Sequence, residues 1–127
     1  MDIKPILIVD DEAIVRDSIS DWLNAAGYQT ETAESGEKAL AMVASKDYSI
    51  AILDVRLPGK SGIEVLKDIK LMKPYIKSIV ITAFPSEGSA DEAKKLGAVD
   101  YLIKPVLPEN LEKVILETVE KYKLGKR

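Results

Sequence analysis

Polar residues that could do chemistry follow four short apolar runs of the sequence. In chain order they are Asp10, Asp11, Glu12, Asp54, Thr82 and Lys104. Two carboxylates about 5 Å apart repel each other by roughly 3 kcal/mol at an effective dielectric constant near 20, and a hard divalent cation would relieve this repulsion. Mg²⁺ suits such oxygen ligands, whereas zinc and copper favour Cys or His ligands, which the chain lacks.

A divalent cation, a fixed ammonium and a hydroxyl together suit a phosphoryl group, because they balance its charge and hold its oxygens. Asp54 is the best candidate for a nucleophile, since it stands on a central-looking strand between the other acids and Lys104. Attack of its carboxylate on phosphorus gives an aspartyl phosphate. Taken singly, these acids could be helix caps or turn residues. Folding alone, however, does not require these acids and a lysine to lie at the ends of separate strands.

Short apolar runs alternate with segments of helical period along the chain. Strands are predicted at residues 5–10, 28–32, 49–54, 78–82 and 99–103, the second of which is polar and typical of an edge strand. Helices are predicted at residues 12–26, 36–46, 61–72, 86–96 and from 108 to about 122. This alternation predicts an α/β fold, a (βα)₅ parallel sheet with helices on both faces. Right-handed crossovers place all the strands' carboxyl ends at one edge, where such sheets bind ligands.

The fourth helix gives the weakest signal. Gly88 lies inside it, and residues 83–91 are polar and contain Gly and Pro, so we expect a short or mobile helix. Ser61 and Ser89 each precede a glutamate by three residues, which is the spacing of a capping box. Trp22 falls on the apolar stripe of the first helix and is expected to pack in the core rather than to stack on a cofactor.

The composition indicates one globular domain. The chain has 127 residues, 46% of them hydrophobic, and a net charge of −3, which argues against non-specific nucleic-acid binding. It contains neither cysteine nor histidine, which excludes disulfides, thiol catalysis and a phosphohistidine carrier. No apolar run reaches the roughly 18–20 residues of a membrane span, and no signal peptide is evident, so we expect a cytoplasmic protein.

The motifs at the strand ends resemble those of the receiver domain of two-component response regulators, over roughly residues 4–122. Four ordered stretches carry the resemblance: Ile-Leu-Ile-Val-Asp10-Asp11-Glu12, Ile-Leu-Asp54-Val-Arg-Leu-Pro58-Gly-Lys-Ser-Gly62, Val-Ile-Thr82-Ala83 and Gly-Ala-Val-Asp-Tyr101-Leu-Ile-Lys104-Pro105. The resemblance implies a flavodoxin-like sheet with strand order 2-1-3-4-5. It also implies a signalling switch controlled by phosphorylation.

The resemblance gives each acid a role. Asp54 would accept a phosphoryl group from the phosphohistidine of a sensor histidine kinase or a phosphotransfer protein. Asp10 and Asp11 would hold Mg²⁺, together with Asp54 and the backbone carbonyl of Arg56. The domain would not be an enzyme in the usual sense, because it would catalyse only its own phosphorylation and dephosphorylation.

The resemblance also implies a conformational change. Lys104 would pair with a phosphoryl oxygen, and Pro105 would follow it through a cis bond. The Thr82 hydroxyl would turn to the phosphoryl group, and Tyr101 would then rotate inward. The surface of the fourth helix, fifth strand and fifth helix would change shape and be read by a partner, often through a homodimer.

Two further expectations concern rates and boundaries. Positions two past Asp54 and two past Thr82 often tune dephosphorylation in this family, and here they are Arg56 and Phe84. Residues 1–122 would form the receiver domain, and residues 123–127 a C-terminal tail or the start of a linker. A nucleic-acid contact would come only through an effector domain outside this sequence, and no membrane contact is expected.

Two other functions compete with the switch. A small Mg²⁺-dependent phosphohydrolase could also use an Asp nucleophile, but such enzymes usually carry a second Asp two residues later, where this chain has Arg56. A flavodoxin-like cofactor binder would need a Thr-, Ser- or Gly-rich phosphate loop after the first strand. The acids at residues 10–12 would instead repel a phosphate unless a cation intervened.

Overall fold

Five parallel strands form one sheet in a computed structural model that describes residues 3–125, the side chain of Glu87 excepted. The elements in chain order are β1 (Ile6–Val9), α1 (Ala13–Ala25), β2 (Thr30–Ala33), α2 (Gly36–Ser45), β3 (Ile50–Asp54), α3 (Gly62–Met72), β4 (Lys77–Thr82), α4 (Glu87–Lys95), β5 (Asp100–Ile103) and α5 (Pro108–Lys121). The strand order is β2-β1-β3-β4-β5, and every pair is parallel. The predicted fold class and strand order are therefore confirmed.

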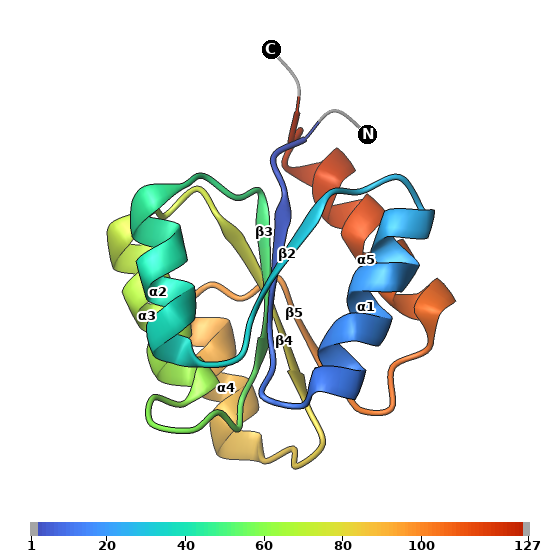
Figure 1. The fold of residues 1–127 in the computed structure, drawn as a ribbon. Coiled ribbons are helices and arrows are strands. Elements are labelled where there is room, and N and C mark those ends of the chain that lie inside the picture. The colour runs from blue at the N-terminus through green and yellow to red at the C-terminus, as the bar shows by residue number, and fades with distance from the viewer. Residues whose placement is uncertain (1–2, 126–127) are drawn as a thin grey trace.

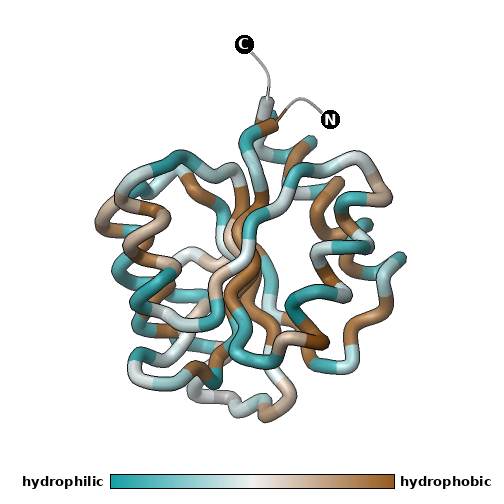
Figure 2. Tube along the Cα trace, in the orientation of Figure 1, coloured by the Kyte–Doolittle hydropathy of each residue, from teal (hydrophilic) through white to brown (hydrophobic). Residues whose placement is uncertain are grey.

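Helices cover both faces of the sheet. In Figure 1, α2, α3 and α4 lie on one side, and α1 and α5 lie on the other. Alternate strand residues point to opposite faces, so Leu7, Leu53 and Val80 pack under α2 to α4. Ile8 and Ile52, in turn, pack under α1 and α5. Each buried Leu, Ile or Val side chain contributes about 1.5–3 kcal/mol, and Figure 2 shows the apolar residues concentrated along the sheet.

The two edge strands differ from their sequence predictions. β2 begins at Thr30 rather than at residue 28, because Gly27 adopts a positive φ of 99° and the Tyr28 side chain turns into the core beside α5. β5 was predicted to be buried, but Asp100 and Ile103 are exposed and the other two residues are only half-buried. Its position at the edge of the sheet, with β4 as its one neighbour, explains the exposure.

The helix ends show which caps the sequence identified correctly. Ser61 and Glu64 form the predicted capping box at the start of α3. The capping box predicted at Ser89 is wrong, because α4 begins one turn earlier and Ser86 occupies the N-cap. The Ser86 hydroxyl oxygen accepts the backbone N–H of Ser89 at 3.1 Å. With nine residues, α4 is short, as expected.

The described part of the chain begins and ends on the side of the sheet where the strands start (Figure 1). After α5, Leu124 packs against the core cluster to which α1 and α5 contribute. Lys126 and Arg127, the last residues of the expected tail, lie outside the described residues. Within residues 3–125, no helix is both long enough and apolar enough to cross a membrane.

Candidate functional site

Asp10 and Asp54 lie close together at the carboxyl edge of the sheet, which is the lower edge in Figure 1. β1 and β3 are paired in parallel register with Val9 opposite Leu53, so Asp10, which follows β1, and Asp54, the last residue of β3, emerge at the same level. Both acids are buried, with 3% and 5% of their surface exposed. Arg16 of α1 donates to the Asp10 carbonyl at 2.7 Å and fixes the loop after β1, a contact that no sequence pattern indicated.

Lys104 joins these acids from the far end of the chain. Its ammonium donates to Asp10 Oδ2 at 2.9 Å and to Asp54 Oδ2 at 3.1 Å. A longer contact of 3.4 Å joins the ammonium to Glu12 Oε1. The sequence placed Glu12 at this edge but indicated no role for it. The backbone N–H of Lys104 donates to the Thr82 carbonyl at 2.8 Å, and the Lys104–Pro105 peptide bond is cis, as expected.

Burial and charge perturb both partners of the Lys104–Asp54 contact. Burial raises the pKa of the Asp54 carboxyl, and the neighbouring Asp10 raises it further, while hydrogen bonds from Lys104 and the Arg56 N–H oppose the change. Burial alone would lower the pKa of the Lys104 ammonium, but its hydrogen bonds to the two acids outweigh this effect and hold the pKa above its usual value. The lysine is therefore a permanent cation at neutral pH.

The acidic cluster has the donor set of a hard cation. One carboxylate oxygen from each of Asp10, Asp11, Glu12 and Asp54 lies within 4.8 Å of the others. All of these donors are oxygens, and the sequence contains no Cys or His, so the residues fit a Mg²⁺-like ion rather than zinc or copper. The backbone of Arg56 also lies at the acidic cluster, because its N–H donates to Asp54 Oδ1 at 3.1 Å.

Thr82 ends β4, the neighbour of β3, and Tyr101 lies one strand further away on β5; both hydroxyls have hydrogen-bond partners outside the acidic cluster. Thr82 is fully buried on the neighbouring strand, and its hydroxyl oxygen accepts the backbone N–H of Phe84 at 3.0 Å. The Tyr101 hydroxyl lies 2.7 Å from Ser89 Oγ in α4. Both hydroxyls are thus held by the segment that runs from β4 into α4.

A shallow pocket of about 340 Å³ opens above the acids. Asp11, Asp54 and Lys104 line it together with Arg56 and Phe84. The Arg56 guanidinium lies over the Phe84 ring, 4.2 Å from its centroid, in a cation–π arrangement at the rim. The sequence identified both positions, but only the folded chain shows that they touch.

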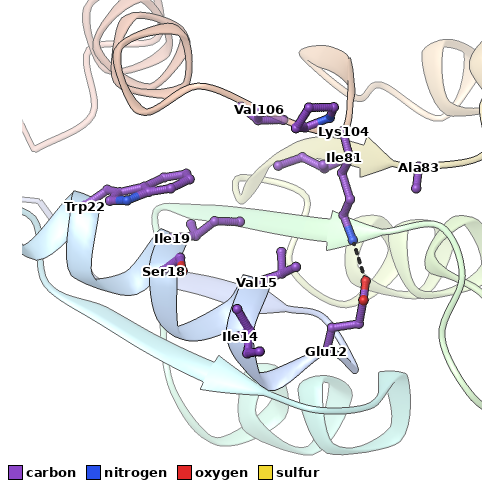
Figure 3. A pocket seen from close by; sticks show the side chains of 11 residues that line it. Glu12, Ile14, Val15, Ser18, Ile19, Trp22, Ile81, Ala83, Lys104 and Val106 are labelled. Carbon is purple, nitrogen blue, oxygen red and sulfur yellow. Dashed lines mark hydrogen bonds and ion pairs between the residues drawn. The ribbon is translucent and has the colours of Figure 1, made fainter.

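An apolar groove of about 450 Å³ continues from the same place along α1. Figure 3 shows Ile14, Val15 and Trp22 along α1, with Lys104 and Glu12 at one end. The groove and the acidic pocket share Glu12, Ala83 and Lys104. Trp22 is half-buried against the core, as its stripe position indicated, and also forms part of the groove wall.

Comparison with known proteins identifies this arrangement. Residues 6–116 match the family described as the response regulator receiver domain. The transcriptional regulatory protein ZraR of Salmonella typhimurium is 42% identical over 119 residues, which are 91% of this chain and 27% of ZraR. This chain therefore spans about a quarter of that relative's length.

Solved structures agree. A CheY-like response regulator receiver domain protein from Methanospirillum hungatei superposes with a TM-score of 0.93 at 31% identity, over 95% of this chain and 97% of that one. The response regulator TrrA of Thermotoga maritima, solved in complex with Mg²⁺ and beryllium fluoride, gives a TM-score of 0.83 at 34% identity, over 91% and 99%. The matches support the switch and not the phosphohydrolase, and the chain belongs to the response regulator receiver domains, the phosphorylation-dependent switches of two-component signal transduction.

Proposed function

We propose that Asp54 is the phosphoacceptor of this receiver domain. The observation that carries the proposal is the contact of one ammonium, that of Lys104, with both Asp10 and Asp54 at the sheet edge. Asp54 lies in the pocket above the acids, and its two oxygens are oriented by Lys104 and by the Arg56 N–H. Such preorganised donors favour charge that develops during phosphoryl transfer.

The transfer itself forms one bond and breaks another. A carboxylate oxygen of Asp54 attacks phosphorus, and the P–N bond to the donor's phosphohistidine breaks. The electron pair of that bond stays with the imidazole nitrogen, which then takes a proton from water. Lys104 holds an oxygen of the transferred group, because its ammonium already points at Asp54.

Mg²⁺ is the proposed cofactor. Asp10, Asp11 and Asp54 would hold it with the backbone carbonyl of Arg56, and the clustering of acid oxygens within 4.8 Å supports this set. The Mg²⁺ and beryllium fluoride in the TrrA structure support the same choice. When bound, the ion supplies positive charge that offsets the charge of the carboxylates and of the phosphoryl oxygens.

Thr82 and Tyr101 are the proposed switch residues. Thr82 precedes the loop into α4, and Tyr101 contacts the first turn of that helix. Their response to phosphorylation would reshape the surface of α4, β5 and α5. The exposed side chains of Ile103 and Leu107 on this surface support its use by a partner or in a homodimer.

The phosphodonor is proposed to be a sensor histidine kinase or a phosphotransfer protein that docks on the groove along α1. A helix seated there would meet the exposed Ile14 and end beside Lys104 and Glu12. The shared residues of groove and pocket would then bring its phosphohistidine to Asp54. The apolar wall suits an amphipathic helix.

Residues 1–122 are proposed to form the receiver, with residues 123–127 as a tail or the beginning of a linker. The 27% coverage of ZraR makes an attached effector a natural partner for this domain, and any contact with nucleic acid would come through such an effector. A cytoplasmic location is proposed because the phosphodonors named above act there.

Labelling with acetyl phosphate tests the phosphoacceptor. With Mg²⁺ present, the wild type should gain the mass of one phosphoryl group, and Asp54→Asn should gain none. Asp47→Asn, an exposed acid that pairs with Lys73, is the control and should be labelled normally. Labelling of Asp54→Asn at the wild-type level would refute the assignment.

A further inference from the structure

Ser89 has a position that its capping pattern does not explain. Ser86 caps α4 by accepting the backbone N–H of Ser89, so the Ser89 side chain is not itself the cap. Its Oγ instead lies 2.7 Å from the phenolic oxygen of Tyr101 on β5. This is a contact between the first turn of α4 and a proposed switch residue.

The other hydrogen bonds of Ser89 favour one direction for its contact with Tyr101. The Ser89 hydroxyl donates its one proton to the Ser86 carbonyl at 3.2 Å. Its oxygen accepts from the Ser86 hydroxyl at 3.0 Å. The separation allows either hydroxyl to donate; with the Ser89 proton on the Ser86 carbonyl, Tyr101 donates and Ser89 Oγ accepts. The phenol is therefore tied to a helix turn whose own hydroxyls are mutually satisfied.

Few other contacts hold the first turn of α4. Among the side chains of α4 that the structure describes, only Ala93 is buried, while Ser89 and Ala90 are half-buried. Gly88 has open space around the position of a Cβ, and glycine disfavours a helix interior by about 1 kcal/mol relative to alanine. One hydrogen bond, with a net value of about 1 kcal/mol, is a large share of what fixes such a turn.

The hydrogen bond between Tyr101 and Ser89, a tether between β5 and α4, also closes a ring of connections to the site. From Tyr101 the chain runs along β5 to Lys104, whose backbone N–H donates to Thr82. From Thr82 the chain runs through Phe84, which donates to the Thr82 hydroxyl, to the cap at Ser86 and back to Ser89. Any rotation of Tyr101 must therefore either break the bond to Ser89 or carry the first turn of α4 with it.

We propose that Ser89 is a positioning residue that makes Tyr101 and the first turn of α4 respond as one unit to phosphorylation of Asp54. The inference rests on the proposed function, because it assumes that Asp54 takes the phosphoryl group. It assigns Ser89 no contact with that group. Its effect is transmitted through Tyr101 alone.

Amide hydrogen exchange at Ala90 measures this coupling, because that N–H donates to the Ser86 carbonyl and closes the first turn. The probe is Mg²⁺ with beryllium fluoride as a phosphoryl analogue. In the wild type, its addition should change the Ala90 exchange rate by about fivefold, the population shift that corresponds to about 1 kcal/mol. In Ser89→Ala, Ala90 should not respond, while the NMR signal of Val55, next to Asp54, still reports binding.

Three variants separate the tether from simple helix damage. Tyr101→Phe keeps the ring but removes the hydroxyl, so it should abolish the Ala90 response, and adding Ser89→Ala should change nothing more. Ser89→Thr restores a hydroxyl and should restore the response. Ser86→Ala removes the cap but leaves the Ser89 hydroxyl, so Ala90 should exchange faster and still respond.

Two outcomes overturn the inference. If Val55 responds and Ala90 responds as strongly in Ser89→Ala as in the wild type, the tether has no role and the proposed function is untouched. The tether is equally refuted if Ser86→Ala abolishes the response as fully as Ser89→Ala does. If Val55 of the wild type does not respond to the probe, the proposed phosphoacceptor fails, and the inference fails with it.

Discussion

The ammonium of Lys104 lies 3.1 Å from Asp54 Oδ2, although 50 positions separate the two residues in the chain. The same nitrogen lies 2.9 Å from Asp10, and the side chains of Asp10 and Asp54 are only 4% and 6% exposed. Two buried carboxylates this close would repel each other strongly. Lys104 therefore stabilises the fold at the position where it is proposed to bind the phosphoryl group.

Replacing this lysine should cost stability and impair the switch without removing the metal site. Lys104→Met keeps most of the side-chain volume, but it leaves two buried acids without their cation. We expect a loss of about 3 kcal/mol in the free energy of unfolding, measured by urea titration with EDTA present. Mg²⁺ binding should persist, since its proposed ligands remain, while the response of α4 to beryllium fluoride should be lost.

Lys60 provides a matched control for this loss. Its ammonium lies 2.6 Å from Asp68, but the two side chains are 38% and 31% exposed. Surface pairs of this kind contribute at most about 1 kcal/mol, so Lys60→Met should cost far less than Lys104→Met. Equal losses for the two variants, or a large drop in Mg²⁺ affinity for Lys104→Met, would contradict the role given to Lys104.

The raised pKa of Asp54 predicts a dependence of stability on pH. The folded protein holds the Asp54 proton more tightly than the unfolded chain, in which the carboxyl titrates near its ordinary value of 3.8. The stabilisation is complete below that value and is lost as the pH rises through the folded-state pKa. Asp54→Asn lacks this titration, so its stability relative to wild type should increase from about pH 4 upward.

Urea titrations in EDTA at a series of pH values check this difference. The control is Asp47→Asn, whose carboxyl has its pKa lowered by hydrogen bonds from Tyr75 and Lys73. Its stability relative to wild type should change with pH in the opposite sense. Profiles for Asp54→Asn and wild type that run parallel across the acidic range would mean that Asp54 titrates normally.

Much of the fold could be predicted because its signals are local. The apolar runs of β1 and β3 are buried along their whole length, as parallel central strands require. The same reasoning failed for β5, whose sequence is also largely apolar, because position in the sheet rather than sequence decides that it lies at an edge. The prediction of the α4 N-cap failed for a related reason. Ser86 and Ser89 are both residues that can cap a helix, and only the path of the loop selects Ser86.

The candidate site likewise contains some contacts that the sequence could predict and others that it could not. That Asp10, Asp54 and Lys104 meet could be predicted from one topological rule about the carboxyl ends of parallel strands. The contacts of Arg56 with Phe84 and of Tyr101 with Ser89 could not. Each joins two segments through side-chain directions that no short sequence pattern specifies, so these partners emerge only from the folded chain.

Asp11 should be the acid whose removal most clearly separates metal binding from stability. It is exposed, and Lys104 contacts Asp10, Glu12 and Asp54 rather than Asp11. Asp11→Ala should relieve repulsion and raise the melting temperature in EDTA, yet reduce Mg²⁺ affinity by at least about tenfold. Isothermal titration with Mg²⁺ and thermal melts measure the two effects.

Asp17→Ala removes an exposed acid further along α1 and controls for general charge effects. It should leave both Mg²⁺ affinity and melting temperature close to those of the wild type. A melt of Asp11→Ala that showed only destabilisation, with Mg²⁺ binding retained, would count against the acidic cluster as the metal site.

The groove along α1 yields a prediction about partner recognition. Ile14 is 82% exposed, so Ile14→Ser should leave the fold intact. If a phosphodonor helix docks there, the variant should need about tenfold more of a phosphorylated histidine phosphotransfer protein to reach half-maximal labelling, as expected for truncation of an interface anchor. Labelling by acetyl phosphate should be unchanged, because a small donor reaches Asp54 without using the groove.

Leu71→Ser is the matched control, since Leu71 is 76% exposed but lies at the end of α3, away from the carboxyl edge. It should be labelled normally by both donors. Trp22, the single tryptophan of the chain, lines the groove, so its fluorescence should change when the phosphotransfer protein binds wild type and change less with Ile14→Ser at equal concentration. Equal sensitivity of the two serine variants to the protein donor would place the docking surface elsewhere.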